Sequence, residues 1–340
     1  MSAGPKSAPL LQVEDLCVSF DSLRGTVNVL DGISFDVQPG EIVGIVGESG
    51  SGKSVTSLAI MGLLGAQGQV DRGRITLDGT DLTALDDRAM RDIRGRAMAM
   101  IFQEPTTSLN PVFPVGFQIA EVLIEHFAMA PREAHRRAVE LMDRVGIPAA
   151  AARAVDYPHQ LSGGMKQRIM IAMALACQPK LLIADEPTTA LDVTIQAQIL
   201  DLIRDLRADF GMGVLLITHD MGVIAEMADR VIVMYAGQVV ERSSAAALFD
   251  DPRHPYTRLL LRSIPSARAK QAVLPMIDGT TPAPTDFPSG CRFHPRCPIA
   301  AAECSAATPG FADCGDGHLA RCIRLDHARD LDRALPEVVS

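Results

Sequence analysis

The chain has no excess of basic charge. Its 340 residues include 32 lysines and arginines against 41 aspartates and glutamates, which gives a net charge of −9. A protein that binds nucleic acid usually shows a basic domain, so we expect no nucleic-acid partner. One basic stretch, residues 132–137, alternates with other residue types at helical spacing and is predicted to be a solvated helix face.

The chain also lacks a long apolar run. None reaches the roughly 18–20 residues needed to cross a bilayer. Residues 1–6 hold one lysine and no apolar stretch, so we expect no secretory signal. We therefore expect the chain to stay in the cytosol and to reach a membrane through another subunit. With 47% apolar residues it can fill one large core with extensions, or two domains.

Short apolar strand candidates alternate with helical patterns over most of the chain. Strands are predicted at 11–20, 33–37, 41–46, 74–77, 97–102, 180–184, 213–217 and 230–235. Helices are predicted at 53–64, 116–128, 131–145, 163–177, 193–209 and 220–227. This order predicts an α/β fold around a mainly parallel sheet covered by helices. The proline-punctuated stretch at about 105–165 is predicted to be a helical insert.

A glycine-rich loop joins a predicted strand to a predicted helix. Its residues fit the pattern G-x-x-x-x-G-K-[ST] and are Gly47, Glu48, Ser49, Gly50, Ser51, Gly52, Lys53 and Ser54. The glycines let backbone N–H groups curl around an anion, and the following helix directs its positive end at the phosphates. We assign Lys53 to the β- and γ-phosphates of a nucleotide and Ser54 to Mg²⁺. The flanking strand and helix favour this interpretation over a glycine turn that binds nothing.

Two acidic residues follow the predicted strand at 180–184. Asp185 at its end can hold Mg²⁺ directly or through water. Glu186 comes next, so its side chain points elsewhere and is free to act on water. Without the phosphate loop, the pair would be interpreted as ordinary strand-end charges.

The segment Leu-Ser-Gly-Gly-Met-Lys-Gln-Arg at 161–168 lies between the phosphate loop and the acidic pair. The three motifs in this order resemble ABC ATPases over roughly residues 10–250. The resemblance implies an ABC-type P-loop NTPase cassette, with a β-rich N-terminal subdomain and a helical insert. It also implies that two cassettes pair head to tail, with Ser162, Gly163 and Gly164 of one closing over ATP held by the other. A second ATPase subunit, either a copy or a relative, is therefore expected.

The same resemblance assigns roles to further residues. Glu186 becomes the catalytic base, and Gln103 becomes the Q-loop residue that meets Mg²⁺ or the attacking water. His219 becomes the switch histidine near the γ-phosphate. Asp192 belongs to a D-loop that begins at Ala190. Phe20 is the candidate that stacks on adenine, with an ordinary core residue as the alternative.

Three segments resemble the ATPase subunits of dipeptide and oligopeptide permeases: Gln-Glu-Pro-Thr-Thr-Ser-Leu-Asn-Pro at 103–111, Tyr-Pro-His-Gln at 157–160 and His-Pro-Tyr-Thr-Arg-Leu-Leu at 254–260. In such importers the insert forms a groove for a short helix of the membrane subunit. The resemblance implies an ATP-hydrolysing subunit bound peripherally to the cytoplasmic face of a bacterial inner membrane. Its partners would be two transmembrane permease subunits and, through the complex, an extracytoplasmic solute-binding protein.

Two alternatives to this function stay open. Nickel, glycosides or another small solute could be the cargo, because the cassette does not touch it. A soluble ABC ATPase acting on ribosomes or DNA is the alternative class. Such proteins usually carry two cassettes in one chain, or a large insert such as a coiled coil or a zinc hook, and this acidic chain has neither.

Five of the seven cysteines fall between residues 291 and 322. Disulfides suit a cytosolic chain poorly. Zinc sites usually contain a tight C-x₂₋₄-C pair, whereas these cysteines are separated by five, six, nine and seven residues. The segment 291–298 resembles the C-terminal module of peptide-permease ATPases, in which four cysteines hold a 4Fe–4S cluster.

The resemblance assigns Cys291, Cys297, Cys304 and Cys322 as the cluster ligands and leaves Cys314 spare. A structural staple is the preferred role of the cluster, and redox regulation is the alternative. Zinc, with His294 or His318 as a further ligand, stays open, as does no metal at all.

We predict two domains. The ATPase domain covers 10–260, with its helical subdomain at about 105–165, and a Cys-rich module covers 265–328. Proline, glycine and cysteine become frequent after about residue 250 and no long periodic segment appears. A small irregular module of this kind usually needs a metal or a disulfide.

Overall fold

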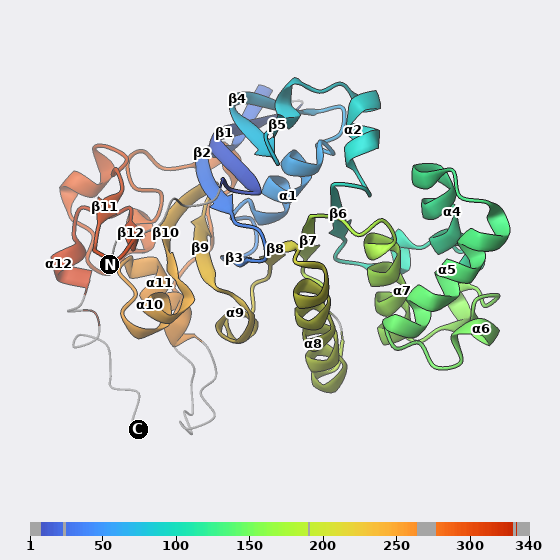
Figure 1. Ribbon diagram of the computed structural model, residues 1–340. Helices are drawn as coiled ribbons and strands as arrows, with labels where there is room; N and C mark the ends of the chain where they lie inside the picture. Colours follow the sequence, from blue (N-terminus) through green and yellow to red (C-terminus); the bar gives the residue numbers. More distant parts are fainter. Residues whose placement is uncertain (1–7, 23–24, 190, 264–276, 329–330, 332–340) are drawn as a thin grey trace. The chain divides into compact units, whose positions relative to one another are not determined.

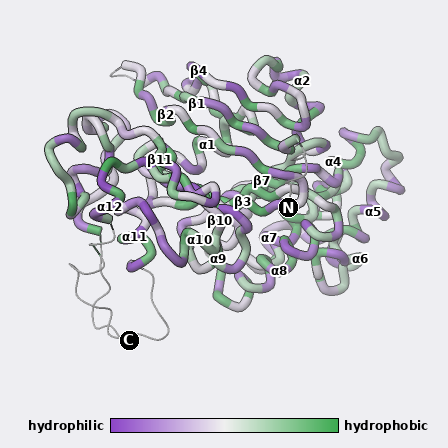
Figure 2. The backbone as a smooth tube through the Cα atoms, turned by 60° about the vertical axis from the view of Figure 1, so that its left-hand side comes forward, coloured by the Kyte–Doolittle hydropathy of each residue, from purple (hydrophilic) through white to green (hydrophobic). Residues whose placement is uncertain are grey.

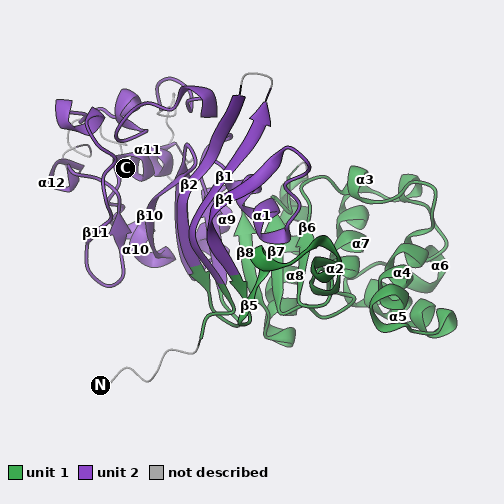
Figure 3. Ribbon diagram, turned by 90° about the horizontal axis from the view of Figure 1, so that it is seen from above, with its two compact units in different colours: residues 1–11, 36–41, 76–217 green, residues 12–35, 42–75, 218–340 purple. Residues whose placement is uncertain are grey.

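The computed structural model describes residues 8–22, 25–189, 191–263, 277–328 and 331 (Figure 1). The chain divides into two compact units that are interleaved in sequence (Figure 3). Unit 1 consists of residues 1–11, 36–41 and 76–217, and unit 2 of residues 12–35, 42–75 and 218–340. Among the described residues, no helix is both long and apolar enough to cross a membrane.

Three parallel strands form the buried centre of unit 1. They are β6 (Met98–Ile101), β7 (Leu181–Asp185) and β8 (Gly213–Ile217), with β7 paired to both others. Every residue of these strands is buried, and most are apolar, as the hydrophobic colouring at β7 illustrates (Figure 2). Strands buried on both faces must be apolar throughout, which is why the sequence shows continuous runs here. The predicted parallel arrangement is confirmed for these three strands.

The insert of unit 1 is helical, as predicted. It contains α3 (Pro105–Ser108), α4 (Val115–Phe127), α5 (Pro131–Arg144), α6 (Ala150–Arg153), η2 (Pro158–Gln160) and the first turns of α7 (Gly163–Leu175). Helices α4 and α5 pack on each other and both contact α7. Unit 1 also contains β5 (Thr80–Asp81), η1 (Leu82–Ala84), α2 (Asp87–Ile93) and α8 (Val193–Phe210).

Unit 2 contains a mixed sheet. Strand β3 (Ile42–Val46) runs parallel to β9 (Arg230–Tyr235), and β9 runs antiparallel to β10 (Gln238–Ser244). Strand β10 in turn pairs with β12 (Leu319–Ala320), and β12 pairs with β11 (Ala312–Asp313). The Cys-rich region therefore adds two short strands to the sheet that carries the phosphate loop. The sequence did not predict β10, β11 or β12.

In the described part of the chain, a second sheet has four strands. Three are long and lie mainly in unit 2, in the order β2 (Gly25–Val37), β1 (Leu11–Ser22) and β4 (Gly68–Leu77), and the short β5 pairs with the end of β4. The helices that follow β3 and precede β9 are α1 (Lys53–Met61) and α9 (Met221–Met227). Helix α9 packs on β3 at Gly44, where an added Cβ would lie 2.5 Å from Ile224 Cδ1. A residue without a side chain is therefore needed at this helix–strand contact.

The described C-terminal part contains α10 (Ala245–Asp250), α11 (Pro255–Arg262), η3 (Pro284–Asp286), η4 (His294–Arg296), η5 (Ala302–Ser305) and α12 (Leu325–Ala328). Helix α11 was not predicted, although with eight residues it is compatible with the absence of a long periodic segment after about residue 250. His254 caps this helix by accepting a hydrogen bond from Tyr256 N, and Pro255 occupies its first position. These are helix-start signals in a helix too short to show a periodic pattern. The domain boundary near 260–265 stays a prediction.

Candidate functional site

The phosphate-loop candidate connects β3 to α1 within unit 2. Gly47, Gly50 and Gly52 all have positive φ angles, of 152°, 79° and 101°. A Cβ at Gly47 would lie 2.2 Å from Met234 O, and one at Gly52 would lie 2.6 Å from Leu30 Cδ2. Both the backbone conformation and the close packing therefore require glycine at these positions. Gly52 is also the N-cap of α1, so no side chain caps the first turn of this helix.

Lys53 is buried and turns back onto the loop. Its Nζ donates hydrogen bonds to Gly47 O at 2.7 Å and to Glu48 O at 3.0 Å. The loop is closed further by Ser51 N, which donates to Glu48 O at 3.2 Å. The ammonium group is therefore held against the backbone of the loop, which is compatible with the predicted phosphate-binding role of Lys53.

In unit 1, the acidic pair lies at the end of β7. Asp185 is buried as the last strand residue, and Glu186 follows with a φ of 47°. The left-handed region is uncommon for a residue with a side chain, and it turns Glu186 away from the direction of the strand. Glu186 Oε2 accepts from Gln103 Nε2 at 2.9 Å and from Thr189 Oγ1 at 2.9 Å. The structure thus brings together two predicted site residues and adds Thr189, which the sequence analysis missed.

The segment at residues 161–168, which resembles the signature sequence of ABC ATPases, contains the start of α7, also in unit 1. Ser162 is the N-cap, and its Oγ accepts from Met165 N at 3.4 Å. A Cβ at Gly163 would lie 3.8 Å from Leu191 Cδ2, and one at Gly164 would lie 2.8 Å from Ile195 Cγ2. The start of α7 therefore lies beside the start of α8, which Asp192 caps through Ile195 N. The predicted signature and D-loop segments are neighbours, although Ala190 lies outside the described residues.

The other predicted nucleotide residues lie in unit 2. His219 is exposed just before α9, whose N-cap Asp220 accepts from Gly222 N and Val223 N. Phe20 on β1 is half-buried beside Gly68 of β4, where an added Cβ would lie 2.8 Å from Phe20 Cε1. The roles of both residues, like those of the signature and the acidic pair, stay predictions.

A pocket in unit 2 is lined by the four predicted cluster ligands, Cys291, Cys297, Cys304 and Cys322. His254, His294 and Phe293 also line it, whereas Cys314 and His318 do not. His318 Nε2 instead lies 2.6 Å from Oε1 of the buried Glu241. The backbone links two of the cysteines, because Cys291 N donates to Cys304 O at 2.8 Å. The five clustered cysteines of the sequence therefore separate into four that face one pocket and one that does not.

Burial raises the pKa of three of the thiols that line the pocket. The pKa is raised to about 12 for Cys297 and to about 11 for Cys322, mainly by burial, and neighbouring cysteines contribute in the same direction. The same burial raises the pKa of Cys291. In the part of the chain that the structure describes, no group of three or more His, Cys, Asp or Glu residues is arranged so that it could hold a metal ion. The four thiols thus line one pocket, without an arrangement ready to hold a metal ion.

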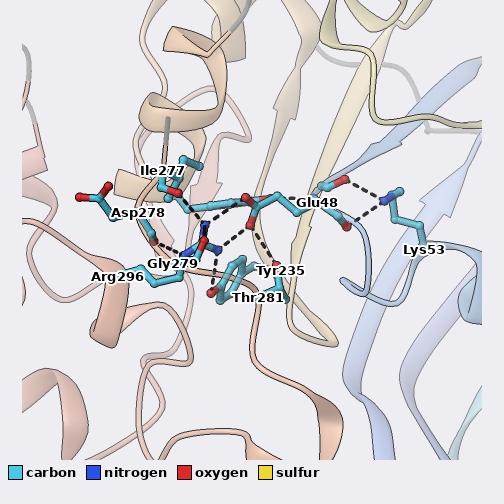
Figure 4. Close-up of polar contacts among 10 residues, drawn as sticks. Glu48, Lys53, Tyr235, Ile277, Asp278, Gly279, Thr281 and Arg296 are labelled. Atoms are coloured by element: carbon cyan, nitrogen blue, oxygen red, sulfur yellow. Dashed lines mark hydrogen bonds and ion pairs between the residues drawn. The ribbon is translucent and has the colours of Figure 1, made fainter. Parts of the chain in front are cut away.

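Glu48, at the second position of the phosphate loop, has several contacts that the sequence analysis did not predict (Figure 4). Its carboxylate pairs with Arg296 and accepts from Thr281, and its backbone N donates to Tyr256 Oη. The partners lie more than 200 positions further along the chain. The sequence holds no local signal for such contacts, although Tyr256 belongs to the segment 254–260 singled out above.

Comparisons with known proteins agree with this geometry. Residues 30–189 match the family model described as "ABC transporter". A solved structure of the ATP-binding cassette MJ0796, a dimer bound to ADP and Pi, is 29% identical with a TM-score of 0.63, and the match covers 69% of this chain and 98% of that one. The fold and the family match together define an ATP-hydrolysing cassette of the ABC class.

Residues 240–304 match a second model, "Oligopeptide/dipeptide transporter, C-terminal region". The dipeptide transport ATP-binding protein DppD of Escherichia coli (strain K12) is 50% identical over 92% of this chain and 96% of its own length. The oligopeptide transport ATP-binding protein AppD of Bacillus subtilis (strain 168) is 52% identical over 92% and 96%. A putative peptide import ATP-binding protein of Brucella abortus (strain 2308) is 52% identical over 93% and 97%. The chain belongs to this family of ABC transporter ATP-binding proteins.

Proposed function

We propose that the chain is the ATP-hydrolysing subunit of a di- or oligopeptide importer, bound peripherally to the cytoplasmic face of a bacterial inner membrane. The observation that carries the proposal is the combination of a complete cassette with the C-terminal region matched at residues 240–304. The names of the relatives support peptides as the cargo over nickel or another solute. The remaining partners are a second ATPase subunit, two permease subunits and, through the complex, a solute-binding protein.

Each predicted site residue has a defined role in the proposed reaction. Lys53 and the loop N–H groups bind the β- and γ-phosphates, and Ser54, Asp185 and Gln103 would hold Mg²⁺, which neutralises charge on the phosphates. Glu186 takes a proton from water, the water oxygen bonds to the γ-phosphorus, and the bond to the β–γ bridging oxygen breaks, which releases ADP. Gln103 and Thr189 hold the Glu186 carboxylate at 2.9 Å each, so its direction is fixed. Positioning and charge supply most of the catalysis.

The other half of each site comes from a facing subunit in this proposal. Ser162, Gly163 and Gly164 would add a hydroxyl, backbone N–H groups and the start of α7 to the γ-phosphate bound by the facing cassette. His219 would contact the same phosphate, and Phe20 would stack on adenine. Pairing of two cassettes then makes hydrolysis depend on closure, and reopening after hydrolysis resets the docked permease.

We propose that the Cys-rich pocket holds a 4Fe–4S cluster. The donor set supports this, because Cys291, Cys297, Cys304 and Cys322 line the pocket and no acidic residue does. Four thiolates that line one pocket suit an iron–sulfur cluster, which distributes its thiolate ligands over several irons. When bound, it would cross-link an otherwise irregular part of unit 2.

Replacement of pocket cysteines tests the cluster. Each of Cys291→Ser, Cys297→Ser, Cys304→Ser and Cys322→Ser should abolish the broad absorbance at ~400 nm of anaerobically purified protein and its content of about four irons per chain. Cys314→Ser is the matched control and should keep both, because Cys314 does not line the pocket. Colourless wild-type protein with one zinc per chain and no iron would contradict the cluster and support zinc as the bound metal.

The insert supplies the proposed docking surface for the permease. Phe113 and Phe117 are each 42% exposed and stack with their ring centroids 5.1 Å apart. Val115 N donates to Asp156 O at 2.9 Å, which places the exposed Val155 and Tyr157 near the same end of α4. Exposed apolar side chains gathered in this way are typical of an interaction site.

Affinity purification from membranes tests both the docking surface and the class of protein. The tagged chain should bring down two permease subunits and a second ATPase, whereas stable association with ribosomes or DNA would contradict the proposal. The variant Phe113→Ser/Phe117→Ser should reduce recovery of the permease subunits by at least tenfold, because burial of a large apolar side chain is worth roughly 1.5–3 kcal/mol and about 1.4 kcal/mol corresponds to tenfold in affinity. Phe127→Ser, at the other end of α4 and 47% exposed, is the matched control and should reduce it little.

A further inference from the structure

Glu48 is held by a fork of hydrogen bonds from the C-terminal region of unit 2 (Figure 4). Arg296 Nη1 lies 2.6 Å from Glu48 Oε2, and Arg296 Nη2 lies 3.1 Å from Glu48 Oε1. Thr281 Oγ1 also donates to Glu48 Oε2, at 3.0 Å. The Arg296 side chain is only 7% exposed and that of Glu48 28%. A two-pronged pair with this burial is stronger and more directional than an ordinary surface ion pair.

The backbone of Glu48 is fixed from the same side. Glu48 N donates to Tyr256 Oη at 2.8 Å, and Tyr256 is completely buried in α11. Arg296 Nη1 also donates to Tyr235 Oη at 3.2 Å, and the two tyrosine rings pack with centroids 4.7 Å apart. Both the side chain and the main chain of Glu48 are therefore held by residues outside the phosphate loop.

The guanidinium of Arg296 also donates hydrogen bonds to the backbone of residues 277–279. Its Nε donates to Asp278 O at 2.8 Å, and its Nη2 donates to Ile277 O and Gly279 O at 3.3 Å each. Arg296 ends η4 and directly precedes Cys297, which lines the cysteine pocket. The guanidinium thus connects the Cys-rich region to the phosphate loop, and its planar set of donors suits this task in a way that a lysine cannot match.

The loop has a physical need for such support. Positive φ angles at Gly47 and Gly50 flank Glu48, and glycine gives the backbone little stiffness of its own. Glu48 O accepts from Lys53 Nζ, so the position of Glu48 determines where one anchor of the lysine lies. Displacement of Glu48 would therefore move both the N–H groups and the cation that receive the triphosphate.

We propose that Arg296 is a positioning residue for ATP binding, through which the Cys-rich region fixes Glu48 and keeps the phosphate loop in its receptive shape. The proposal rests on the proposed phosphate-binding role of residues 47–54 and is independent of what the cysteine pocket holds. It predicts an effect on nucleotide affinity rather than on the chemical step.

The test is a double-mutant cycle on the full chain, with the dissociation constant for ATP and kcat at saturating ATP as readouts. Arg296→Ala should raise the dissociation constant about tenfold and change kcat less than twofold, as expected when binding alone is lost. Glu48→Gln should do the same, and the double variant should be no worse than either single one, because both remove one interaction. Arg296→Lys should give an intermediate loss, and it serves if Arg296→Ala does not fold.

Arg292→Ala is the matched control. Arg292 is adjacent to Cys291, as Arg296 is adjacent to Cys297. Arg292 forms an ion pair of 2.7 Å with Asp31 of β2, which attaches the Cys-rich region to the second sheet, and it does not contact the phosphate loop. It should leave ATP affinity unchanged. Equal losses of ATP affinity in Arg292→Ala and Arg296→Ala would assign the effect to general loosening of the region and overturn the proposal. Wild-type affinity in folded Arg296→Ala would also overturn it. So would a loss in the Arg296→Ala/Glu48→Gln double variant equal to the product of the two single losses. If Lys53→Ala retains ATP binding, the phosphate-loop assignment itself fails; if it loses binding and Arg296→Ala does not, the failure is confined to Arg296.

Discussion

The variant Glu186→Gln is expected to bind ATP as tightly as the wild type and to hydrolyse it about 100-fold more slowly or worse. Removal of a general base costs roughly 10²–10⁴ in rate. Glutamine keeps an oxygen that can accept the hydrogen bonds from Gln103 Nε2 and Thr189 Oγ1, so the local structure should survive. What it loses is the ability to take a proton from water. Single-turnover hydrolysis and equilibrium ATP binding on the same preparation separate the two effects.

Glu104→Gln is the control for this prediction. Glu104 is an exposed acidic residue next to Gln103. Its replacement by glutamine removes the same charge as Glu186→Gln does, without changing a residue at the end of β7. It should leave both binding and hydrolysis unchanged. Hydrolysis at the wild-type rate in Glu186→Gln would remove Glu186 from the reaction, whereas parallel loss of binding and hydrolysis would indicate a structural role.

The second large effect is expected for Lys53→Ala, which should weaken ATP binding by about 100-fold or more. The buried ammonium is held by Gly47 O and Glu48 O at the centre of the loop, so its loss removes the positive charge opposite the phosphates. Hydrogen bonds to charged groups contribute roughly 1.5–3 kcal/mol each, and 2.8 kcal/mol corresponds to about 100-fold in affinity. Equilibrium dialysis with labelled ATP measures this directly.

Lys180→Ala provides the comparison, because Lys180 is an exposed lysine paired with Asp78 on the surface of unit 1. Surface ion pairs contribute about 1 kcal/mol or less to stability, and ATP binding should not change. Unaltered ATP binding in folded Lys53→Ala would contradict the assignment of residues 47–54 as the phosphate loop.

Sequence reasoning was most successful where local pattern and burial coincide. Strands β8 and β9 have the bounds that their apolar runs predict, and α8 begins directly after Asp192, its cap. The phosphate loop could be recognised because its glycines serve backbone conformation and its lysine lies at fixed spacing from them. Such features depend on neighbours in the chain, and a single sequence therefore contains them.

Contacts between distant residues could not be predicted in the same way. Arg296 and Tyr256 contact Glu48 from a C-terminal region that β10 and β12 join to the sheet carrying the loop. A two-residue strand such as β12 has no periodicity to read, and an arginine in an irregular segment has many possible partners. Thr189 could not be predicted for a related reason. Its contact with Glu186 depends on the left-handed backbone conformation of Glu186.

The most direct test of the account is uptake of a labelled dipeptide by vesicles that contain the copurified complex, its solute-binding protein, and ATP on the side of the ATPase subunits. Uptake should require ATP, should exceed uptake of Ni²⁺ under the same conditions, and should stop when the subunit carries Glu186→Gln. Uptake that continues at the wild-type rate with this variant, or a complex that hydrolyses ATP but moves no peptide, would contradict the account.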